Sequence, residues 1–208
     1  MLHEIFDDIF RNKPRSIPLG DVIRTTSGGT PTRKHSEYYL GGNIAWVKSK
    51  ELLGGYITDT EEKISALGLK NSSAKMLPQN SVLIAMYGAT VGSYGIISKP
   101  MTCNQAICAL ICNDDYPYTY LYQLACESVD YLKNMSVGSA QQNISQVIIQ
   151  QMPVHNDPIC VERFHRIVRP IHEKLRELRI ESNHLQELRD TLLPRLMSGE
   201  LDVSDLDI

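Results

Sequence analysis

The sequence predicts an α+β fold, with a head built on a mixed or antiparallel sheet and a long C-terminal coiled-coil helix. Residues 17–153 hold short segments rich in β-branched and aromatic residues, each bounded by Gly, Pro or Asn, as is typical of strands and turns. From residue 154 onward the sequence shows a heptad pattern instead of this alternation of strand and turn segments. The 208 residues, 42% of them hydrophobic, suffice for one core and an extended appendage. We therefore expect an arm (1–16), a head (17–153) and a helical region (154–208).

The arm is predicted to form a short amphipathic helix that Pro14 and Pro18 end. Its apolar side consists of Ile5, Phe6, Ile9 and Phe10. In the head, a long polar loop (27–42) precedes the first clear strand. The strands are predicted at residues 43–49, 81–88, 94–98 and 104–112.

Two helical segments are expected within the head. A helical turn is predicted within residues 63–75, and a longer helix over residues 117–135. In the longer one, apolar residues recur at helical spacing: Leu121, Leu124, Ala125, Val129 and Leu132. Together with the strands, these helices make the head an α+β domain.

Three glycines within residues 86–99 raise the possibility of a phosphate-binding loop. A dinucleotide fingerprint needs G-x-G-x-x-G at the start of a helix, and a Walker A loop needs Gly-Lys-Ser/Thr. Here the spacing is G-x-x-x-G-x-x-G, and β-branched residues and a proline follow. The run therefore predicts a hairpin with Thr90 and Tyr94 at or near its tip. Whether this tip faces a ligand or packs under the head stays open at this point.

Residues 154–208 are predicted to begin a helix with Asp157 as N-cap and Pro158 at the first helical position. Alternating steps of four and three then connect nine positions, seven of them apolar, and Leu188 lies beside the arginine in this series. The nine positions are Phe164, Val168, Ile171, Leu175, Leu178, Ser182, Leu185, Arg189 and Leu192. Such a series is typical of a seam between two helices.

The alternative is an amphipathic helix that lies on its own domain, which would need a wider apolar stripe. Charged residues flank the series on both sides, so we favour the helix-to-helix seam. Pro170 is expected to bend the helix, because an interior proline is unfavourable by about 3 kcal/mol. Residues 171–193 would then form the regular part, a rod of about 35 Å.

Composition excludes several classes of protein. No apolar run approaches the roughly 20 residues that span a bilayer, and Glu4, Asp7 and Asp8 interrupt the only candidate signal peptide. The five cysteines form no CxxC pair and are expected to be buried thiols in a reducing cytoplasm: Cys103, Cys108, Cys112, Cys126 and Cys160. The net charge is −3 and the head has ten basic and ten acidic residues, so bulk electrostatics alone would not hold it on nucleic acid.

No catalytic motif is present in the sequence. It lacks a Gly-x-Ser-x-Gly elbow, a His-Glu-x-x-His metal motif and an Asn-Pro-Pro-Tyr methyltransferase motif, and its six histidines are scattered. We therefore expect a binding module rather than an enzyme, with no cofactor and no metal.

The polar loops of the head carry side chains of the kinds that contact DNA, although composition alone favours ordinary solvated loops. Arginine and lysine hold phosphates or read guanine, while glutamine and asparagine pair with adenine. The candidate contacts are Arg33, Lys34, Lys48, Lys50, Thr90, Tyr94, Gln141, Gln142 and Asn143.

Six stretches in this order resemble the specificity subunit of type I restriction–modification systems. They are "IPLGDVIRTTSGGTP", "NIAWVKSKEL", "LPQNSVLIAMYGATVGSYGIIS", "CNQAICAL", "GSAQQNISQVIIQQMPV" and "LRDTLLPRLMSGELDV". The resemblance implies that residues 17–153 form one DNA-reading target recognition domain and residues 154–208 one helical spacer. Such subunits usually hold two of each, so this chain would be a half-size form, either natural or a fragment.

The resemblance also implies partners: double-stranded DNA, methyltransferase subunits and a restriction or translocase subunit. We expect a homodimer in which the helices pair antiparallel and read an inverted repeat. Its seam would consist of Phe164, Val168, Ile171, Leu175, Leu178, Leu185, Leu188 and Leu192. The alternative function is that of a coiled-coil interaction protein whose α+β head binds protein or carbohydrate.

Overall fold

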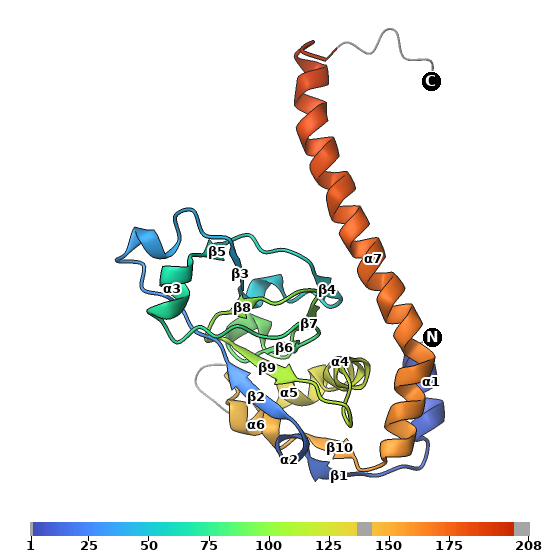
Figure 1. Cartoon of the computed structure of the whole chain (residues 1–208). Coiled ribbons are helices and arrows are strands. Elements are labelled where there is room, and N and C mark those ends of the chain that lie inside the picture. The colour runs from blue at the N-terminus through green and yellow to red at the C-terminus, as the bar shows by residue number, and fades with distance from the viewer. Residues whose placement is uncertain (1, 137–142, 202–208) are drawn as a thin grey trace, which may run out of the picture.

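The computed structural model describes residues 2–136 and 143–201, and a five-stranded sheet forms the centre of its head (Figure 1). The strands follow the order β2 (Arg24–Ser27), β9 (Ile107–Ile111), β6 (Val82–Ala85), β7 (Tyr94–Ile97) and β4 (Tyr56–Ile57). Neighbours are antiparallel except β4 and β7, which are parallel. The sheet is therefore mixed, and the predicted α+β class is confirmed.

A second, three-stranded sheet supports a side lobe. Its order is β5 (Lys63–Ile64), β3 (Ile44–Val47) and β8 (Thr102–Cys103), with β3 and β8 parallel. The side lobe, residues 28–75 without β4, also carries η1 (Ser36–Tyr38), η2 (Ser49–Glu51) and α3 (Ala66–Lys70). A small hydrophobic cluster fills it: Trp46, Ile64 and Ala74, with Tyr39, Ile44 and Leu69 packed against them. In Figure 1, α3 lies on the side of the head away from α7.

The two ends of the head meet at its base. β1 (Arg15–Pro18) pairs antiparallel with β10 (Pro153–His155), so that Ile17 lies opposite Val154. Two short helices flank this pair in the chain: α2 (Leu19–Val22) follows β1, and α6 (Gln146–Gln150) precedes β10. Because Leu19 donates its N–H to the carbonyl of Met152 at 2.8 Å, the base is closed by backbone as well as by side chains.

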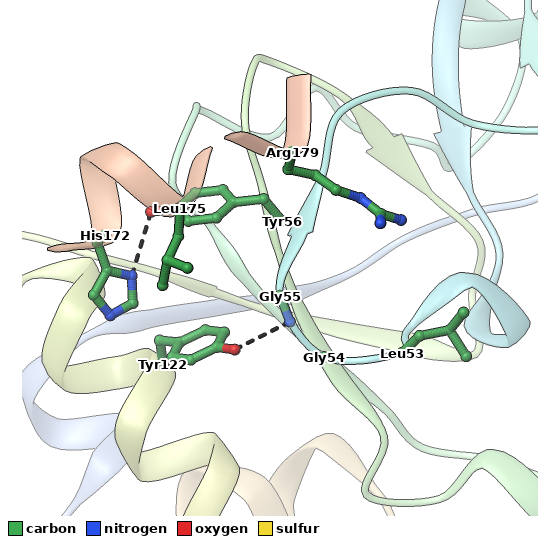
Figure 2. A pocket seen from close by; sticks show the side chains of 8 residues that line it. All are labelled: Leu53, Gly54, Gly55, Tyr56, Tyr122, His172, Leu175 and Arg179. Carbon is green, nitrogen blue, oxygen red and sulfur yellow. Dashed lines mark hydrogen bonds between the residues drawn. The ribbon is translucent and has the colours of Figure 1, made fainter. Parts of the chain in front are cut away.

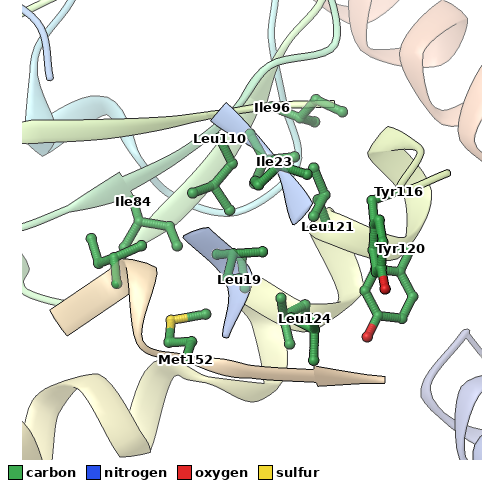
Figure 3. Packing of buried hydrophobic residues seen from close by; sticks show 14 of the residues in the cluster. Leu19, Ile23, Ile84, Ile96, Leu110, Tyr116, Tyr120, Leu121, Leu124 and Met152 are labelled. Atoms are coloured by element: carbon green, nitrogen blue, oxygen red, sulfur yellow. The ribbon is translucent and has the colours of Figure 1, made fainter. Parts of the chain in front are cut away.

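Helices cover the lower part of the head and complete its main core. The predicted helix over residues 117–135 is in fact two helices, α4 (Tyr118–Glu127) and α5 (Val129–Ser136), separated at Ser128. The predicted arm helix is confirmed as α1 (Leu2–Phe10), which buries Phe6, Ile9 and Phe10. Figure 3 shows Leu19, Leu110, Leu121 and Met152 within this core.

The predicted hairpin between β6 and β7 is confirmed, but its tip is longer than a tight turn. Residues 86–93 connect the strands and include η3 (Gly88–Thr90). Gly88 and Gly92 have φ of +67° and +80°, a conformation that glycine adopts readily. A Cβ at Gly92 would also lie 3.0 Å from the carbonyl oxygen of Val129. The glycines therefore serve turn geometry and close backbone approach.

α7 (Pro158–Met197) begins where the sequence indicates and is 40 residues long, about 60 Å. The Asp157 side chain accepts a hydrogen bond from the N–H of Cys160 at 3.0 Å. The helix continues through Pro170 and Pro194, so neither proline interrupts it. Two of the predicted seam residues are wrong: Phe164 and Val168 are buried in the main core against α1 and α4 and are closed to a second helix.

The prediction of five buried thiols is also partly wrong. Cys103 and Cys108 are buried, and burial raises the pKa of each to about 12. Cys112 and Cys160 are half-buried, whereas Cys126 is exposed on α4. Within residues 2–136 and 143–201, no helix is long and apolar enough to cross a membrane.

Candidate nucleic-acid interface

Three of the predicted DNA contacts converge on a pair of glutamates between β4 and β5. Arg33 donates to Glu62 at 2.5 Å, Lys48 Nζ lies 3.0 Å from Glu61 and 2.9 Å from Glu62, and Lys50 Nζ lies 2.6 Å from Glu61. We call these five residues the charged loop cluster. With three cations and two carboxylates, its net formal charge is +1.

The side lobe holds Arg33 in place. Its guanidinium lies 4.1 Å from the ring centroid of Tyr39 and 5.7 Å from that of Trp46, which places it in cation–π range of both. Tyr39 donates to the carbonyl of Pro31 at 2.5 Å, and Trp46 Nε1 donates to the carbonyl of Gly29 at 2.9 Å. Tyr39 and Trp46 of the lobe core therefore hold both the Arg33 side chain and the backbone of the loop that precedes it.

The two glutamates are held by their backbone as well. The N–H of Glu61 donates to Glu51 Oε1 at 2.9 Å, while Glu51 Oε2 accepts from the N–H of Lys48 at 2.7 Å. Thr60 Oγ1 donates to the carbonyl of Glu62 at 2.7 Å. The acidic pair therefore faces the cations because the loop is anchored there.

Hydrogen bonds within the cluster favour the charged forms of Lys48, Glu61 and Glu62. Hydrogen bonds from Lys50 and Lys48 lower the pKa of Glu61 to about 2, and those from Lys48 and Arg33 lower the pKa of Glu62. Burial lowers the pKa of Lys48, but the hydrogen bonds to Glu62 and Glu61 outweigh it, so the net shift is upward. The sequence interpretation missed both glutamates because it considered only cations and amides. No pattern in the sequence indicates that Glu61 and Glu62 lie beside Lys48 and Lys50.

The tip of the β6–β7 hairpin gathers two more of the predicted residues. Asn143 forms an isolated antiparallel bridge with Tyr87, and its Oδ1 accepts from the N–H of Gly88 at 3.3 Å. Thr90 Oγ1 donates to the carbonyl of Tyr87 at 3.0 Å. Tyr87 is exposed at this tip, although the sequence interpretation did not include it.

The remaining predicted contacts are dispersed. Tyr94 packs under the head, with its ring centroid 5.4 Å from that of Tyr122, and burial raises its pKa. Lys34 is exposed in the side lobe beside Arg33. Gln141 and Gln142 lie outside the described residues.

A cavity of about 420 Å³ lies between α7 and the head (Figure 2). Its lining consists of Leu53, Gly54, Gly55, Tyr56, Tyr122, His172, Leu175 and Arg179. The Tyr56 hydroxyl lies 3.3 Å from His172 Nδ1, and the Tyr122 hydroxyl accepts from the N–H of Gly55 at 3.0 Å. Burial, and after it His165, lowers the pKa of His172 to about 4, so this imidazole is neutral at pH 7. The polar atoms here join α7 to the head, which favours a structural role.

The C-terminal half of α7, residues 178–197, is called the far half here and has two different sides. Asn183 Nδ2 donates to Thr58 Oγ1 at 2.5 Å, and a second cleft of about 440 Å³ lies between this side and the head. On the other side, at heptad spacing, lie Leu178, Leu185 and Leu192, which are exposed. At 100° per residue, Leu178 and Ile180, which lines the cleft, point in nearly opposite directions. This apolar stripe is therefore open to a second helix.

One cluster on the described residues has the composition of a metal site. His3, Asp7 and Glu127 place possible ligand atoms within 4.8 Å of one another. Glu127, however, already accepts hydrogen bonds from Arg15 and Gln123. These contacts make it an ion-pair network between α1 and α4.

A family model for the type I restriction modification DNA specificity domain matches residues 15–188, which include the head and most of α7. The chain belongs to this family. The six stretches that resemble type I specificity subunits lie mainly on the scaffold of the family fold, including β2, β3, β6, β7 and β9. Arg33, Glu61 and Glu62 lie outside those stretches. Lys48 and Lys50 lie within the second of these stretches, and the range matched by the family model includes all five residues of the charged loop cluster.

Individual specificity subunits are similar over nearly the whole of this chain. The type I restriction enzyme HindI specificity subunit of Haemophilus influenzae is 31% identical over 188 residues, 88% of this chain and 40% of the relative. The MjaIX specificity subunit of Methanocaldococcus jannaschii is 23% identical over 203 residues, 90% of this chain and 44% of the relative. The chain thus spans less than half the length of these curated relatives.

Solved structures share the fold. The type I restriction–modification S subunit from M. genitalium superposes with a TM-score of 0.66 at 16% identity, covering 94% of this chain and 51% of that one. The HsdS subunit from Thermoanaerobacter tengcongensis gives 0.61 at 16% identity, covering 96% and 50%. The combination of mixed sheets and a long C-terminal helix is therefore the architecture of specificity subunits.

Proposed function

We propose that this chain is a non-catalytic DNA-specificity component of a type I restriction–modification complex. The head would read a short DNA half-site, and the complex would act in the cytoplasm on double-stranded DNA. The observation that carries the proposal is the family match, which includes head and helix together. Methyltransferase subunits would dock on the helical region and supply the chemistry, with a restriction subunit as a further partner.

We assign the sequence-reading role to two surfaces of the head. The charged loop cluster offers guanidinium and ammonium groups for phosphates or guanine, and the hairpin tip offers Thr90 and Asn143. The head holds as many acidic as basic residues, so affinity for DNA without the partners should be low. Tight binding of the isolated protein at physiological salt would contradict this.

The exposed stripe of α7 supports pairing with a second helix. We assign the pairing to the half-buried Ile171 and to the exposed Leu175, Leu178, Leu185, Leu188 and Leu192, because Phe164 and Val168 belong to the core. An antiparallel homodimer would place one head at each end of the helical pair. The complex would then methylate an inverted repeat of two identical half-sites around an unread spacer.

Mapping of methylated adenines tests the DNA-specificity role. Cells that express this chain with its methyltransferase subunits should carry methyladenine at one bipartite motif, which is absent when this chain is omitted. Two identical half-sites would support the homodimer, whereas two different half-sites would mean pairing with a second, non-identical chain. Methylation that is unchanged without this chain would refute the proposed function.

Substitutions on opposite sides of α7 test the dimer. Leu178→Glu with Leu185→Glu places two charges on the stripe and should give monomers by light scattering. Ile180→Glu is the matched control, because Ile180 is also about half exposed but points away from the stripe. Loss of the dimer in the control as well, or in neither variant, would argue against this seam.

A further inference from the structure

The acidic residues of the charged loop cluster carry an inference that rests on the proposed function and adds a specificity device to it. We propose that Glu61 and Glu62 are specificity-determining residues that occupy Arg33, Lys48 and Lys50 and so oppose binding of the head to DNA of arbitrary sequence. A DNA phosphate can use these three cations only if it displaces carboxylates that are already in place.

The geometry accounts for this competition. Each cation has a carboxylate oxygen within 3.0 Å, and Lys48 has one from each glutamate. The Lys48 side chain is only 16% exposed, and its ammonium already contacts both acidic groups. An incoming phosphate would therefore meet two negative charges before it could pair with this lysine.

Backbone contacts hold Glu61 and Glu62 in position before any DNA binds. Glu61 is tied through its N–H to Glu51, and the carbonyl of Glu62 accepts from Thr60 Oγ1 and from the N–H of Trp46 at 3.3 Å. These contacts hold the loop in the absence of DNA. The glutamates therefore differ from exposed side chains that pair only by chance.

The energies of the contacts suit a selective block. Exposed ion pairs are individually weak, so a cognate site that adds base contacts can open them. Non-specific DNA offers phosphates alone, and its binding depends on counterion release by free cations. The repulsive element therefore acts together with the base contacts that only the target supplies.

Binding of duplexes by the assembled complex tests the proposal. Glu61→Gln with Glu62→Gln keeps side-chain size and raises the cluster charge from +1 to +3. We expect scrambled DNA to bind about tenfold more tightly, with a salt slope steeper by up to about three, because three cations become free. Target DNA, identified by methylation mapping, should change less, so the ratio of target to scrambled affinity falls.

Asp114→Asn with Asp115→Asn is the matched control, because these adjacent acidic residues are exposed in the same head and the net charge changes equally. The proposal is overturned if the control raises scrambled binding as much, since the effect would then be overall charge. It is also overturned if the cluster variant loses target binding selectively, since the glutamates would then contact bases. Glu61→Gln alone, whose side chain is 59% exposed, repeats the test if the double variant unfolds.

Failure of the proposed function has a different signature. If the unmodified complex shows no preference for any sequence, the DNA-specificity role is wrong and the comparison has no target duplex. If the unmodified complex prefers its target and the cluster variant has the same ratio, only the role of Glu61 and Glu62 is wrong.

Discussion

Phe164 and Leu185 belong to one heptad series on one helix, yet their surroundings are opposite. Phe164 is 1% exposed and its ring lies 5.1 Å from that of Phe6 on α1, whereas Leu185 is 57% exposed. The near half of α7 is thus an element of the head, and the far half projects beyond the main core. Periodicity identified the apolar side of the helix correctly, but it carried no information on which neighbour covers that side.

The neighbour that covers the near half comes from the opposite end of the chain. α1 and α7 are separated by the whole head in sequence, and the pairing of β1 with β10 brings them together. A seam between two chains and a contact within one chain bury the same kind of side chain. Only the tertiary fold distinguishes the two.

The largest expected difference between the two halves of α7 is in the loss of unfolding free energy caused by alanine substitution. Phe164→Ala removes a core aromatic ring and should lower the free energy of unfolding by about 3–5 kcal/mol. Leu185→Ala should change the stability of the head by less than about 0.5 kcal/mol. Urea unfolding at two protein concentrations measures both, because a loss through a dimer seam depends on concentration. Equal losses that do not depend on concentration would mean that the far half is packed within the chain.

The pH dependence of stability should distinguish the halves next. Burial lowers the pKa of His172 to about 4, against an ordinary value near 6.5. Between these values the unfolded chain binds a proton that the native chain does not, so stability falls as pH decreases from 6.5 to 4. The loss attributable to His172 is about 3 kcal/mol and is complete below pH 4.

His172→Gln should make this pH dependence shallower by the same amount. Part of the slope should remain, because burial also lowers the pKa of His155 to about 4. His184→Gln, an exposed position on the far half, serves as the control and should retain the original slope. Unfolding curves between pH 4 and 7.5 provide the measurement, and identical slopes for both variants would contradict burial of His172 in solution.

Pro170 lies within the near half of α7, two residues before the buried His172, and its removal should stabilise the protein. Proline lacks the N–H that would bond to the carbonyl four residues earlier, so Pro170→Ala restores one helical hydrogen bond. We expect a gain of about 1–3 kcal/mol, seen as a higher midpoint of thermal unfolding. Pro158→Ala is the control, since a proline at the first helical position interrupts no hydrogen bond. A loss of stability in Pro170→Ala would mean that the head requires the proline geometry.

The sequence allowed the class of fold, the hairpin and the long helix to be predicted, because each depends on local periodicity or turn chemistry. It did not allow the division of residues 117–135 at Ser128 or the burial of Phe164 and Val168, which depend on distant neighbours. The same limit applied to the candidate interface. Arg33, Lys48 and Lys50 were chosen for their charge, but their shared partners Glu61 and Glu62 become visible only when β3 and β5 pair.

The smallest effect is expected at the contact between the far half and the head. Asn183 donates to Thr58, and Asn183→Ala removes a single partly exposed hydrogen bond, worth about 0.5–1.5 kcal/mol. The more informative measurement is amide hydrogen exchange, because weaker attachment should raise exchange in α7 beyond Ile180 and leave residues near Phe164 protected. Ser182→Ala, one residue away on the stripe side, should leave exchange unchanged. If the Asn183 variant raised exchange along the whole helix, the two halves would behave as one cooperative unit, and their separation would hold for burial alone.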